Sequence, residues 1–544
     1  MAPERTHLLT VAVEDDFQAT ALGPVVTRRD WTRLESRVLA NTVAALDLIE
    51  AHGAGATFFI LGWVVEQVPE VVEEIVRRGH EVASKGFLHR TPQSMGPEEL
   101  GDDARRAKEA IEQAAGVPVH GHRVARGSLG LEELWALRVL AECGFVYDSS
   151  FYPRLRSIRS QAWRRFPHIH ECGDLSIREF PLSTWGPDAL LFPMAGGNYF
   201  RQAPAWVSRA ALADWERRYR SPFNMYFHVW ELDPATPRIA RAGRLRRLRQ
   251  YRNLRGMAER IEAILERHRF QGIGDLLGLE QREGRPTLAA PAPPSAPTVV
   301  REERTPVTVV VPCYNEEGVL AYTNKALEEA AARLEANYRL AYVFVDDAST
   351  DGTWKRLQEL FGARRDCHLI QQPRNGGVAS AIMTGIRAAE TELVASVDCD
   401  CTYDPGQLVP MLALLEGDPA AMVTASPYHP KGRVVGVPGW RLLLSRGLSS
   451  IYRRLLPDCP ATVTSCFRVY RRSRVEDLEI ENGGFLGVAE ILAVLALRGE
   501  RILEHPAVLE SRLLGESKMK LLRTIAGHLG LLARLLTRRI ATAP

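Results

Sequence analysis

The sequence predicts an α/β protein with mostly parallel strands, divided into two domains. Its 544 residues are more than one hydrophobic core usually holds, and two domains of about 250 residues each are the natural division. Short runs rich in β-branched and aromatic residues, such as ATFFIL at 56–61 and AYVFVD at 341–346, alternate with stretches of helical character. Such alternation is typical of helices packed on a parallel sheet.

The two halves share a plan and are separated by a distinctive segment. The first half opens on a strand-like run, HLLTVAV at 7–13, and the second opens on VTVVVP at 307–312. Residues 283–306 are rich in Pro and Ala and lack an apolar period, which is typical of a semi-rigid linker. We therefore expect three parts: a first domain at 1–282, a linker at 283–304 and a second domain at 305–544.

The composition is that of an ordinary globular protein, with 46% hydrophobic and 25% charged residues. Because 69 basic and 66 acidic residues leave a net charge of only +3, we expect no nucleic-acid partner. The eight cysteines are scattered and form no C-x-x-C motif, as is usual for proteins of a reducing compartment.

We expect neither a secretory signal peptide nor a transmembrane helix from this sequence. The N-terminal segment MAPERTHLLTVAVEDD is charged too early for a secretory signal peptide. No apolar run approaches the roughly 18 residues that a transmembrane helix needs. We therefore predict a cytoplasmic protein, and a peripheral contact with the inner face of the membrane stays open.

The second half places acidic residues directly after three predicted strands. The segments VTVVVPCYNEEGVL, AYVFVDDASTDGT and LVASVDCDCTYDP end in Glu316, Asp346, Asp347, Asp351, Asp398 and Asp400. Ligands of open α/β sheets bind at the carboxyl ends of the strands. Asp398 and Asp400, one residue apart, are suited to hold a hard divalent cation on a diphosphate. Each acidic turn alone would be interpreted as a solvated cap, so the combination of all three predicts the site.

These motifs resemble those of the family 2 inverting glycosyltransferases of GT-A fold, in particular the dolichol-phosphate mannosyltransferases, over residues 305 to about 535. The resemblance implies that Asp398 and Asp400 are the catalytic pair and bind Mg²⁺ or Mn²⁺. RNGGVASAIMTGI at 374–386 resembles the Gly-rich stretch of the family. The resemblance also implies a pocket for a UDP- or GDP-linked sugar, lined by Pro312, Tyr314, Glu316, Val345, Asp347 and Asp398.

The resemblance extends to the acceptor side of the same family, in the segments GWRLLLSRGLS at 439–449 and ESRLLGESKMKLLRTI at 510–525. The resemblance implies that Arg441, Ser445, Arg512 and Lys518 bind the phosphate of an acceptor, which we expect to be polyprenyl phosphate or else a small molecule. Cations and a hydroxyl are the groups that a phosphate monoester needs. Pro427 stands where the family has an arginine, so one phosphate ligand is missing. Thr402 stands where the family has a glutamine.

The acceptor also decides whether a general base is needed. A phosphate is already ionised at pH 7, whereas a hydroxyl acceptor would need a base, and Glu490 is the candidate in that case. On apolar spacing alone, Glu490 instead caps or flanks a helix. The predicted helices at 440–456 and 519–536 mix Leu with Arg, which suits lipid headgroups and internal packing about equally.

The first half resembles the polysaccharide deacetylases of carbohydrate esterase family 4, also called NodB-like. The motifs that carry the resemblance are LTVAVEDDF, GATFFILGWV, GHEVASKGFLHR, YDSSFYP, REFPLSTW, AGGNYFR and FHVWELDP. The resemblance implies a distorted (β/α) barrel, in which one Asp and two His hold Zn²⁺ and leave a position for the attacking water. A second Asp would act as the base and a late His as the acid.

Several residues of this implied site are changed. Ala12 stands where the family has its base, and Lys85 stands where it has the first metal histidine; a protonated lysine donates only and repels a cation. Arg126 stands where the family has a small or turn residue, while Asp15, His89 and His228 remain. We therefore predict a catalytically degenerate domain that binds no metal.

Three alternatives for the first half stay open. Lys85 could pair with Glu14, Asp15 or Asp16 in the vacated metal position and leave a scaffold or a carbohydrate-binding or docking module. Glu14, Asp15, Asp16, His80 and His89 could instead form a shifted metal site. The chain could also be bifunctional and remove the acetyl group from an amino sugar that the second half transfers.

Overall fold

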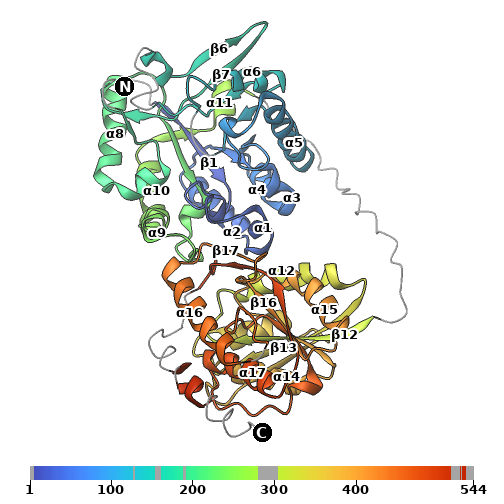
Figure 1. The fold of residues 1–544 in the computed structure, drawn as a ribbon. Coiled ribbons are helices and arrows are strands. Elements are labelled where there is room, and N and C mark those ends of the chain that lie inside the picture. The colour runs from blue at the N-terminus through green and yellow to red at the C-terminus, as the bar shows by residue number, and fades with distance from the viewer. Residues whose placement is uncertain are drawn as a thin grey trace. The chain divides into compact units, whose positions relative to one another are not determined.

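The structure is a computed structural model that describes residues 5–125, 129–153, 161–187, 191–279, 304–456, 458–515, 527–528 and 530–534. These residues form two compact units, which Figure 1 shows as ribbons. The first unit contains residues 5–27, 36–236 and 242–279. The second unit contains residues 28–35 and 237–241 together with the described residues from 304 onward.

The first unit is built on one large sheet. Among its described residues, nine strands form the order β10-β1-β2-β3-β4-β5-β7-β6, with β11 also paired to β1. The strands are β1 (Thr6–Val13), β2 (Thr57–Ile60), β3 (Glu81–Ser84), β4 (Gly121–His122), β5 (Tyr147–Asp148), β6 (His168–Cys172), β7 (Leu175–Glu179), β10 (Asn224–His228) and β11 (Arg269–Gln271). All neighbours run parallel except β6 and β7.

The sheet of the first unit curls toward closure. Asn224, at the start of β10, donates from Nδ2 to the carbonyl of Phe180, just after β7, at 3.0 Å. The two sides of the sheet thus meet through a side chain and not through a full strand pair. This arrangement is the distorted barrel that the sequence predicts.

Helices cover the sheet, and its strands are therefore apolar on both faces. Leu9, Val11 and Val13 of β1 are fully buried and belong to one core with Phe58 and Ile60 of β2. The helices are α2 (Val38–Glu50), α3 (Gly62–Gln67), α4 (Glu70–Arg77), α5 (Pro97–Ala115), α6 (Trp135–Glu142), α7 (Gly197–Gln202), α8 (Ala205–Arg218), α9 (Arg244–Tyr251), α10 (Met257–Leu265) and α11 (Ile273–Leu277). A small separate ribbon pairs β8 (Thr184–Trp185) with β9 (Phe192–Pro193).

The second unit contains a mixed sheet. Among its described residues, seven strands form the order β14-β13-β12-β15-β18-β16-β19. They are β12 (Thr305–Cys313), β13 (Tyr338–Asp346), β14 (Cys367–Gln371), β15 (Leu393–Ser396), β16 (Met422–Ser426), β18 (Arg468–Arg471) and β19 (Ile502–Pro506), and a separate pair joins β17 (Arg433–Val435) to β20 (Val508–Glu510). The first four strands run parallel, and β18 is antiparallel to both β15 and β16.

The order of the parallel strands marks a ligand-binding edge. β12 lies between β13 and β15, so the chain winds in opposite directions on its two sides. The crevice at such a switch point, at the carboxyl ends of the strands, is where open α/β sheets bind ligands. The helices of the unit are α1 (Arg28–Arg33), α12 (Leu320–Leu334), α13 (Thr353–Phe361), α14 (Val378–Ala388), α15 (Leu408–Glu416), α16 (Gly439–Leu455) and α17 (Phe485–Leu497).

The predicted α/β class is confirmed in both units, and the predicted strands at 7–13, 56–61, 307–312 and 341–346 correspond to β1, β2, β12 and β13. Among the helices that the structure describes, none is both long enough and apolar enough to span a bilayer.

Candidate active site

The carboxyl ends of β12, β13 and β15 bring the predicted acidic residues of the second unit to one edge. The register places Pro312 beside Val345 and Cys313 beside Asp346. On the other side of β12, Val310 pairs with Ser396, two residues before Asp398. Parallel pairing therefore gathers side chains that are up to about 90 residues apart in the sequence, as the strand pattern predicts.

An arginine lies on two of these carboxylates. Arg512 donates from Nε to Oδ2 of Asp400 at 2.6 Å, and from its terminal nitrogens to both carboxylate oxygens of Glu316, at 3.0 and 3.4 Å. The side chains of Glu316 and Asp400 are 8% and 11% exposed, and that of Arg512 is 22% exposed. The guanidinium thus joins the end of β12 to the end of β15.

Asp398 carries the strongest sign of crowded negative charge at this edge. Burial, and then the neighbouring Asp400 carboxylate, raise the pKa of Asp398 to about 7. A divalent cation relieves repulsion of this kind, and carboxylate oxygens are the ligands that Mg²⁺ and Mn²⁺ prefer. Asp398 and Asp400 therefore fit the cation that the sequence predicts.

Asp347 has a different task from its neighbours. Its two carboxylate oxygens accept hydrogen bonds from the backbone N–H groups of Gly376 and Gly377, both at 2.7 Å. Gly377 has a φ of +88°, a backbone conformation that favours glycine. Asp347 therefore fixes the Gly-rich turn before α14, and the side chain is 3% exposed. Sequence reasoning did not find this role, because acceptors of backbone hydrogen bonds leave no pattern.

Glu490 is likewise committed to its own chain. It lies inside α17, where Oε2 accepts from the backbone N–H of Asn482 at 2.9 Å and from its side-chain amide at 2.8 Å. Oε1 accepts from the backbone N–H of Glu481 at 3.3 Å. The carboxylate of Glu490 thus holds the loop that precedes α17.

The first unit contains a second cluster, centred on Glu14, which follows β1. Glu14 forms an ion pair with Lys85, and its Oε2 lies 2.9 Å from Nε2 of His89. Nδ1 of His228 lies 2.8 Å from Oε1, without the angle of a good hydrogen bond. Ala12 pairs with His228 in the β1–β10 register. Glu14, Lys85, His89 and His228 thus meet at one point, as the sequence predicts for three of them.

The charges in this cluster balance without a metal. Burial opposes ionisation of Glu14, but Lys85, His89 and His228 outweigh it and hold the pKa of Glu14 well below its ordinary value. Both carboxylate oxygens face these partners, and Lys85 is a cation that repels another. The residues present therefore do not fit a zinc site of the predicted family type.

Other residues that could belong to a shifted metal site lie elsewhere. Asp15 accepts hydrogen bonds from the hydroxyl of Ser36 at 2.7 Å and from the backbone N–H of Arg37 at 2.8 Å. Its carboxylate therefore lies at the N-terminus of α2. Asp16 lies 3.3 Å from the hydroxyl of Tyr251. His80 precedes β3 and packs on Phe58, whereas Lys85 follows the other end of that strand. Of the five residues of that alternative, the structure brings only Glu14 and His89 together.

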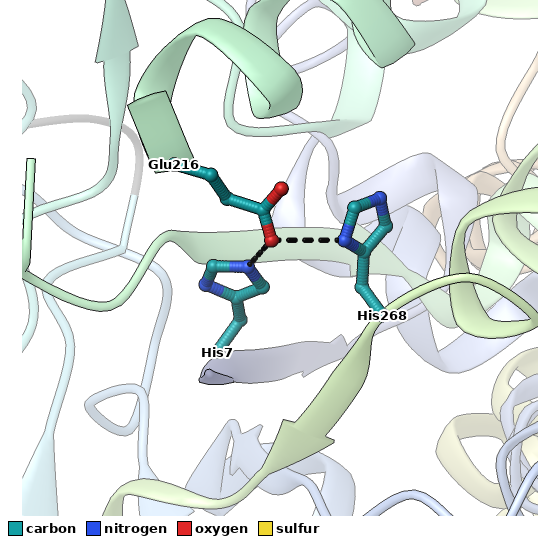
Figure 2. Close-up of side chains that lie close together, drawn as sticks. All are labelled: His7, Glu216 and His268. Atoms are coloured by element: carbon teal, nitrogen blue, oxygen red, sulfur yellow. Dashed lines mark hydrogen bonds and ion pairs between the residues drawn. The ribbon is translucent and has the colours of Figure 1, made fainter. Parts of the chain in front are cut away.

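A third cluster, which sequence reasoning missed, joins His7, Glu216 and His268 (Figure 2). Oε1 of Glu216 lies 3.0 Å from Nε2 of His7 and 3.1 Å from Nδ1 of His268. Nδ1 of His7 accepts from the backbone N–H of Phe223 at 3.1 Å, so the ring proton is on Nε2 and points at Glu216. A metal on Nε2 would move that proton to Nδ1, against another N–H donor. The cluster therefore fits a hydrogen-bonded triad better than a metal site.

Comparison with known proteins matches three segments of the chain to family models. Residues 308–479 match the family model Glycosyl transferase family 2, residues 36–147 match Polysaccharide deacetylase, and residues 149–278 match a domain of unknown function, DUF3473. The chain contains a family 2 glycosyltransferase domain and a polysaccharide deacetylase domain.

Two curated relatives resemble the glycosyltransferase domain. Over 219 residues the chain is 30% identical to the dolichol-phosphate mannosyltransferase of Pyrococcus furiosus, and the match covers 39% of this chain and 59% of that protein. Over 220 residues it is 29% identical to the undecaprenyl-phosphate mannosyltransferase of Micrococcus luteus, with 39% of this chain and 87% of that protein covered. The chain thus spans about three fifths of the length of the first relative.

One solved structure also resembles the glycosyltransferase domain. It is the glucosyl-3-phosphoglycerate synthase of Mycobacterium tuberculosis in complex with Mn²⁺, UDP and glucosyl-3-phosphoglycerate, with 20% identity and a TM-score of 0.33. The match covers 44% of this chain and 81% of that chain.

Of the remaining residues predicted for the glycosyltransferase domain, the structure describes some and leaves others outside the described part. Tyr314 is half-buried two residues after Pro312, and Ser445 is half-buried on α16. Arg441 lies on the same helix, although its side chain is outside the described part. Lys518, like Arg126 of the deacetylase domain, lies outside the described residues.

Proposed function

We propose that the second domain is an inverting glycosyltransferase that moves a sugar from a nucleotide-linked donor to polyprenyl phosphate. The observation that carries the proposal is the group of carboxylates Glu316, Asp398 and Asp400 at the switch point of the sheet, with Arg512 on two of them. The names of the two mannosyltransferase relatives support a lipid-phosphate acceptor and a hexose donor.

The donor side follows from the strand ends. Pro312 and Val345 are neighbours in the β12–β13 register, and with Tyr314 they would form the wall against which a UDP- or GDP-linked nucleoside lies. Asp398 and Asp400 would hold Mg²⁺ or Mn²⁺, which neutralises the charge of the departing diphosphate. Asp347 contributes indirectly, because it fixes the Gly-rich turn beside this wall.

The acceptor side requires little proton chemistry. A phosphate monoester is already a nucleophilic anion at pH 7, whereas a hydroxyl would need a base. Glu490 is the base candidate from the sequence, and its carboxylate is occupied by three N–H donors. This occupancy favours a phosphate acceptor, which Ser445, Arg512 and the basic residues Arg441 and Lys518 would bind.

A membrane contact through α16 is the finer part of this proposal. The helix exposes Trp440, Leu443 and Leu444, at 52%, 74% and 42%, next to the exposed Arg446. An amphipathic face with a tryptophan and cations suits an anionic lipid surface. Sedimentation of the full chain with phosphatidylglycerol vesicles should be strong and should weaken when Leu443 is changed to Glu. Equal sedimentation of both proteins would remove the membrane contact.

Transfer of a radiolabelled hexose to undecaprenyl phosphate, from UDP- and GDP-linked donors in turn, tests the proposal. Asp398→Asn and Asp400→Asn should each lower the rate about 100-fold or more, because the charge of the diphosphate would lose its counter-ion. Asp418→Asn is the matched control, since Asp418 pairs with Arg501 on the surface. Full activity in both site variants would refute the assigned metal residues.

For the first domain we propose a non-catalytic role. The Lys85–Glu14 pair takes the place of the metal, and Ala12 offers no base, so we expect residues 1–282 to serve as a docking or carbohydrate-binding module. Purified full-length protein should contain no stoichiometric zinc in this domain and should release no acetate from chitooligosaccharides. Zinc at one equivalent together with acetate release would instead support the bifunctional alternative.

A further inference from the structure

Arg512 has a feature that binding an acceptor phosphate does not explain. Its guanidinium already forms hydrogen bonds to Asp400 and Glu316, at 2.6 Å and at 3.0 and 3.4 Å. The other oxygen of Asp400, Oδ1, accepts from the backbone N–H of Thr402 at 3.0 Å. Each oxygen of Asp400 therefore already accepts one hydrogen bond, and a metal ion that binds Asp400 shares these oxygens with Arg512 and Thr402.

The charge of Arg512 adds to this competition. A guanidinium held 2.6 Å from a carboxylate that also binds a divalent ion would face that ion at close range. Like charges so close, in a partly buried site, repel strongly because water screens them poorly. A metal ion that arrives alone therefore meets a position which a cation of the chain already fills.

A nucleotide diphosphate reverses this balance. Its oxygens supply the negative charge that both the metal ion and the guanidinium need, and a guanidinium suits phosphate through paired, parallel hydrogen bonds. The side chain of Arg512 is 22% exposed, so it can turn toward a ligand without leaving a buried position. The same residue can thus neutralise the carboxylates first and the phosphates afterwards.

We propose that Arg512 is an internal counter-ion that excludes the metal ion until nucleotide is present, so that metal and nucleotide bind cooperatively. The proposal rests on the metal site of the proposed function. It adds a role for Arg512 on the donor side, before any acceptor binds. By linkage, the factor by which nucleotide tightens metal binding equals the factor by which metal tightens nucleotide binding.

Titration of Mn²⁺ into the full-length chain, followed by the electron paramagnetic resonance signal of the free ion, tests this proposal. Arg512→Gln should bind Mn²⁺ alone about tenfold tighter than the unmodified protein, since one competing charge is gone. With UDP or GDP present, the gain in Mn²⁺ affinity should be smaller in the variant than in the unmodified protein. Arg512→Lys, which keeps the charge but loses the paired hydrogen bonds, should lie between them.

Two controls make the outcomes distinct. Arg501→Gln removes an exposed arginine that pairs with Asp418, and it should leave Mn²⁺ affinity unchanged. Asp398→Asn should abolish Mn²⁺ binding, which locates the ion at this edge.

If Arg512→Gln leaves the affinity for Mn²⁺ unchanged or weakens it while Asp398→Asn abolishes binding, the counter-ion role is refuted and the metal site stands. If Asp398→Asn binds Mn²⁺ normally, both the counter-ion and the metal assignment fail. If the unmodified protein transfers no hexose although Arg512→Gln binds Mn²⁺ more tightly, only the proposed function is refuted.

Discussion

The Glu14 cluster of the first unit and the Asp400 cluster of the second unit both place a basic side chain on carboxylates that follow parallel strands. In the first, Lys85 and Glu14 are 5% and 1% exposed, and two histidines complete the group. In the second, Arg512 is 22% exposed and bridges Glu316 and Asp400. The charge arrangement is similar, but the access of water and ligands differs.

This difference separates a permanent counter-ion from an exchangeable one. Removal of a fully buried cation leaves a carboxylate that neither water nor ligand can reach, so the fold depends on it. A cation near the surface can be replaced by solvent, metal or phosphate at a small cost. The first unit thus holds its cation inside the core, while the second unit holds its cation where a ligand can reach it.

The largest expected effect comes from Lys85→Met. It leaves Glu14 buried with only imidazole partners, and breaking a buried pair costs about 3–5 kcal/mol in the free energy of unfolding. Urea unfolding followed by tryptophan fluorescence measures this, because most tryptophans, including Trp215 and Trp230, lie in the first unit.

Two further variants sharpen this result. The double change Lys85→Met with Glu14→Leu should recover much of the loss, because apolar replacement of both partners is often close to neutral. Arg77→Ala removes an exposed ion pair on α4 and should change the free energy of unfolding much less than Lys85→Met does. A Lys85→Met protein as stable as the Arg77→Ala protein would show that Lys85 is not a structural counter-ion.

The fold was more predictable than the partners within the clusters. Parallel β12, β13 and β15 had to bring Glu316, Asp398 and Asp400 together, so strand pattern alone located that edge. Which acid would meet Lys85 was left open among three neighbours. Side chains alternate along a strand, so Glu14 shares a face with Ala12 and Asp15 points away, a signal that could have excluded Asp15 but not Asp16.

Other contacts had no signal that a sequence could carry. His7 and Glu216 are 209 residues apart and meet only because α8 packs near the start of β1. Glu490 and Asp347 accept hydrogen bonds from backbone N–H groups, which every residue except proline offers. The residue types thus predict a base at Glu490 and a nucleoside contact at Asp347, but they give no sign that both carboxylates also hold loops.

An intermediate effect is expected from Asp15→Asn as a function of pH. Burial raises the pKa of Asp15 to about 6, although hydrogen bonds from Ser36 and Arg37 oppose the shift. The folded state therefore holds this proton more tightly than the unfolded state, and its contribution to stability is complete below about pH 4 and is lost as the pH rises through 6. The asparagine variant lacks this titration.

The measurement is the difference in unfolding free energy between the two proteins from pH 4 to pH 7. As the pH rises, the Asp15→Asn protein should gain stability relative to the unmodified protein by up to about 3 kcal/mol, at 1.4 kcal/mol per pKa unit. Taking the difference cancels all groups that titrate equally in both proteins. A difference that stays constant with pH would place Asp15 in a water-exposed or cation-paired position, closer to the metal-ligand role that the sequence suggested.

The smallest effect, and the direct counterpart of Lys85→Met, is expected from Arg512→Gln. Arg512 is 22% exposed, so water or an ion can take its place, and its loss should cost less than that of the buried Lys85. Hydrogen–deuterium exchange of the peptides that contain β12 and β15 in the full chain measures the change locally. Protection should fall slightly in the variant, and Mn²⁺ should restore it, because the ion replaces the missing cation on Asp398 and Asp400.

A loss of stability as large as that of Lys85→Met, or a loss of protection that Mn²⁺ does not reverse, would mean that Arg512 is also a permanent counter-ion. The difference between the two clusters would then be one of residue type alone.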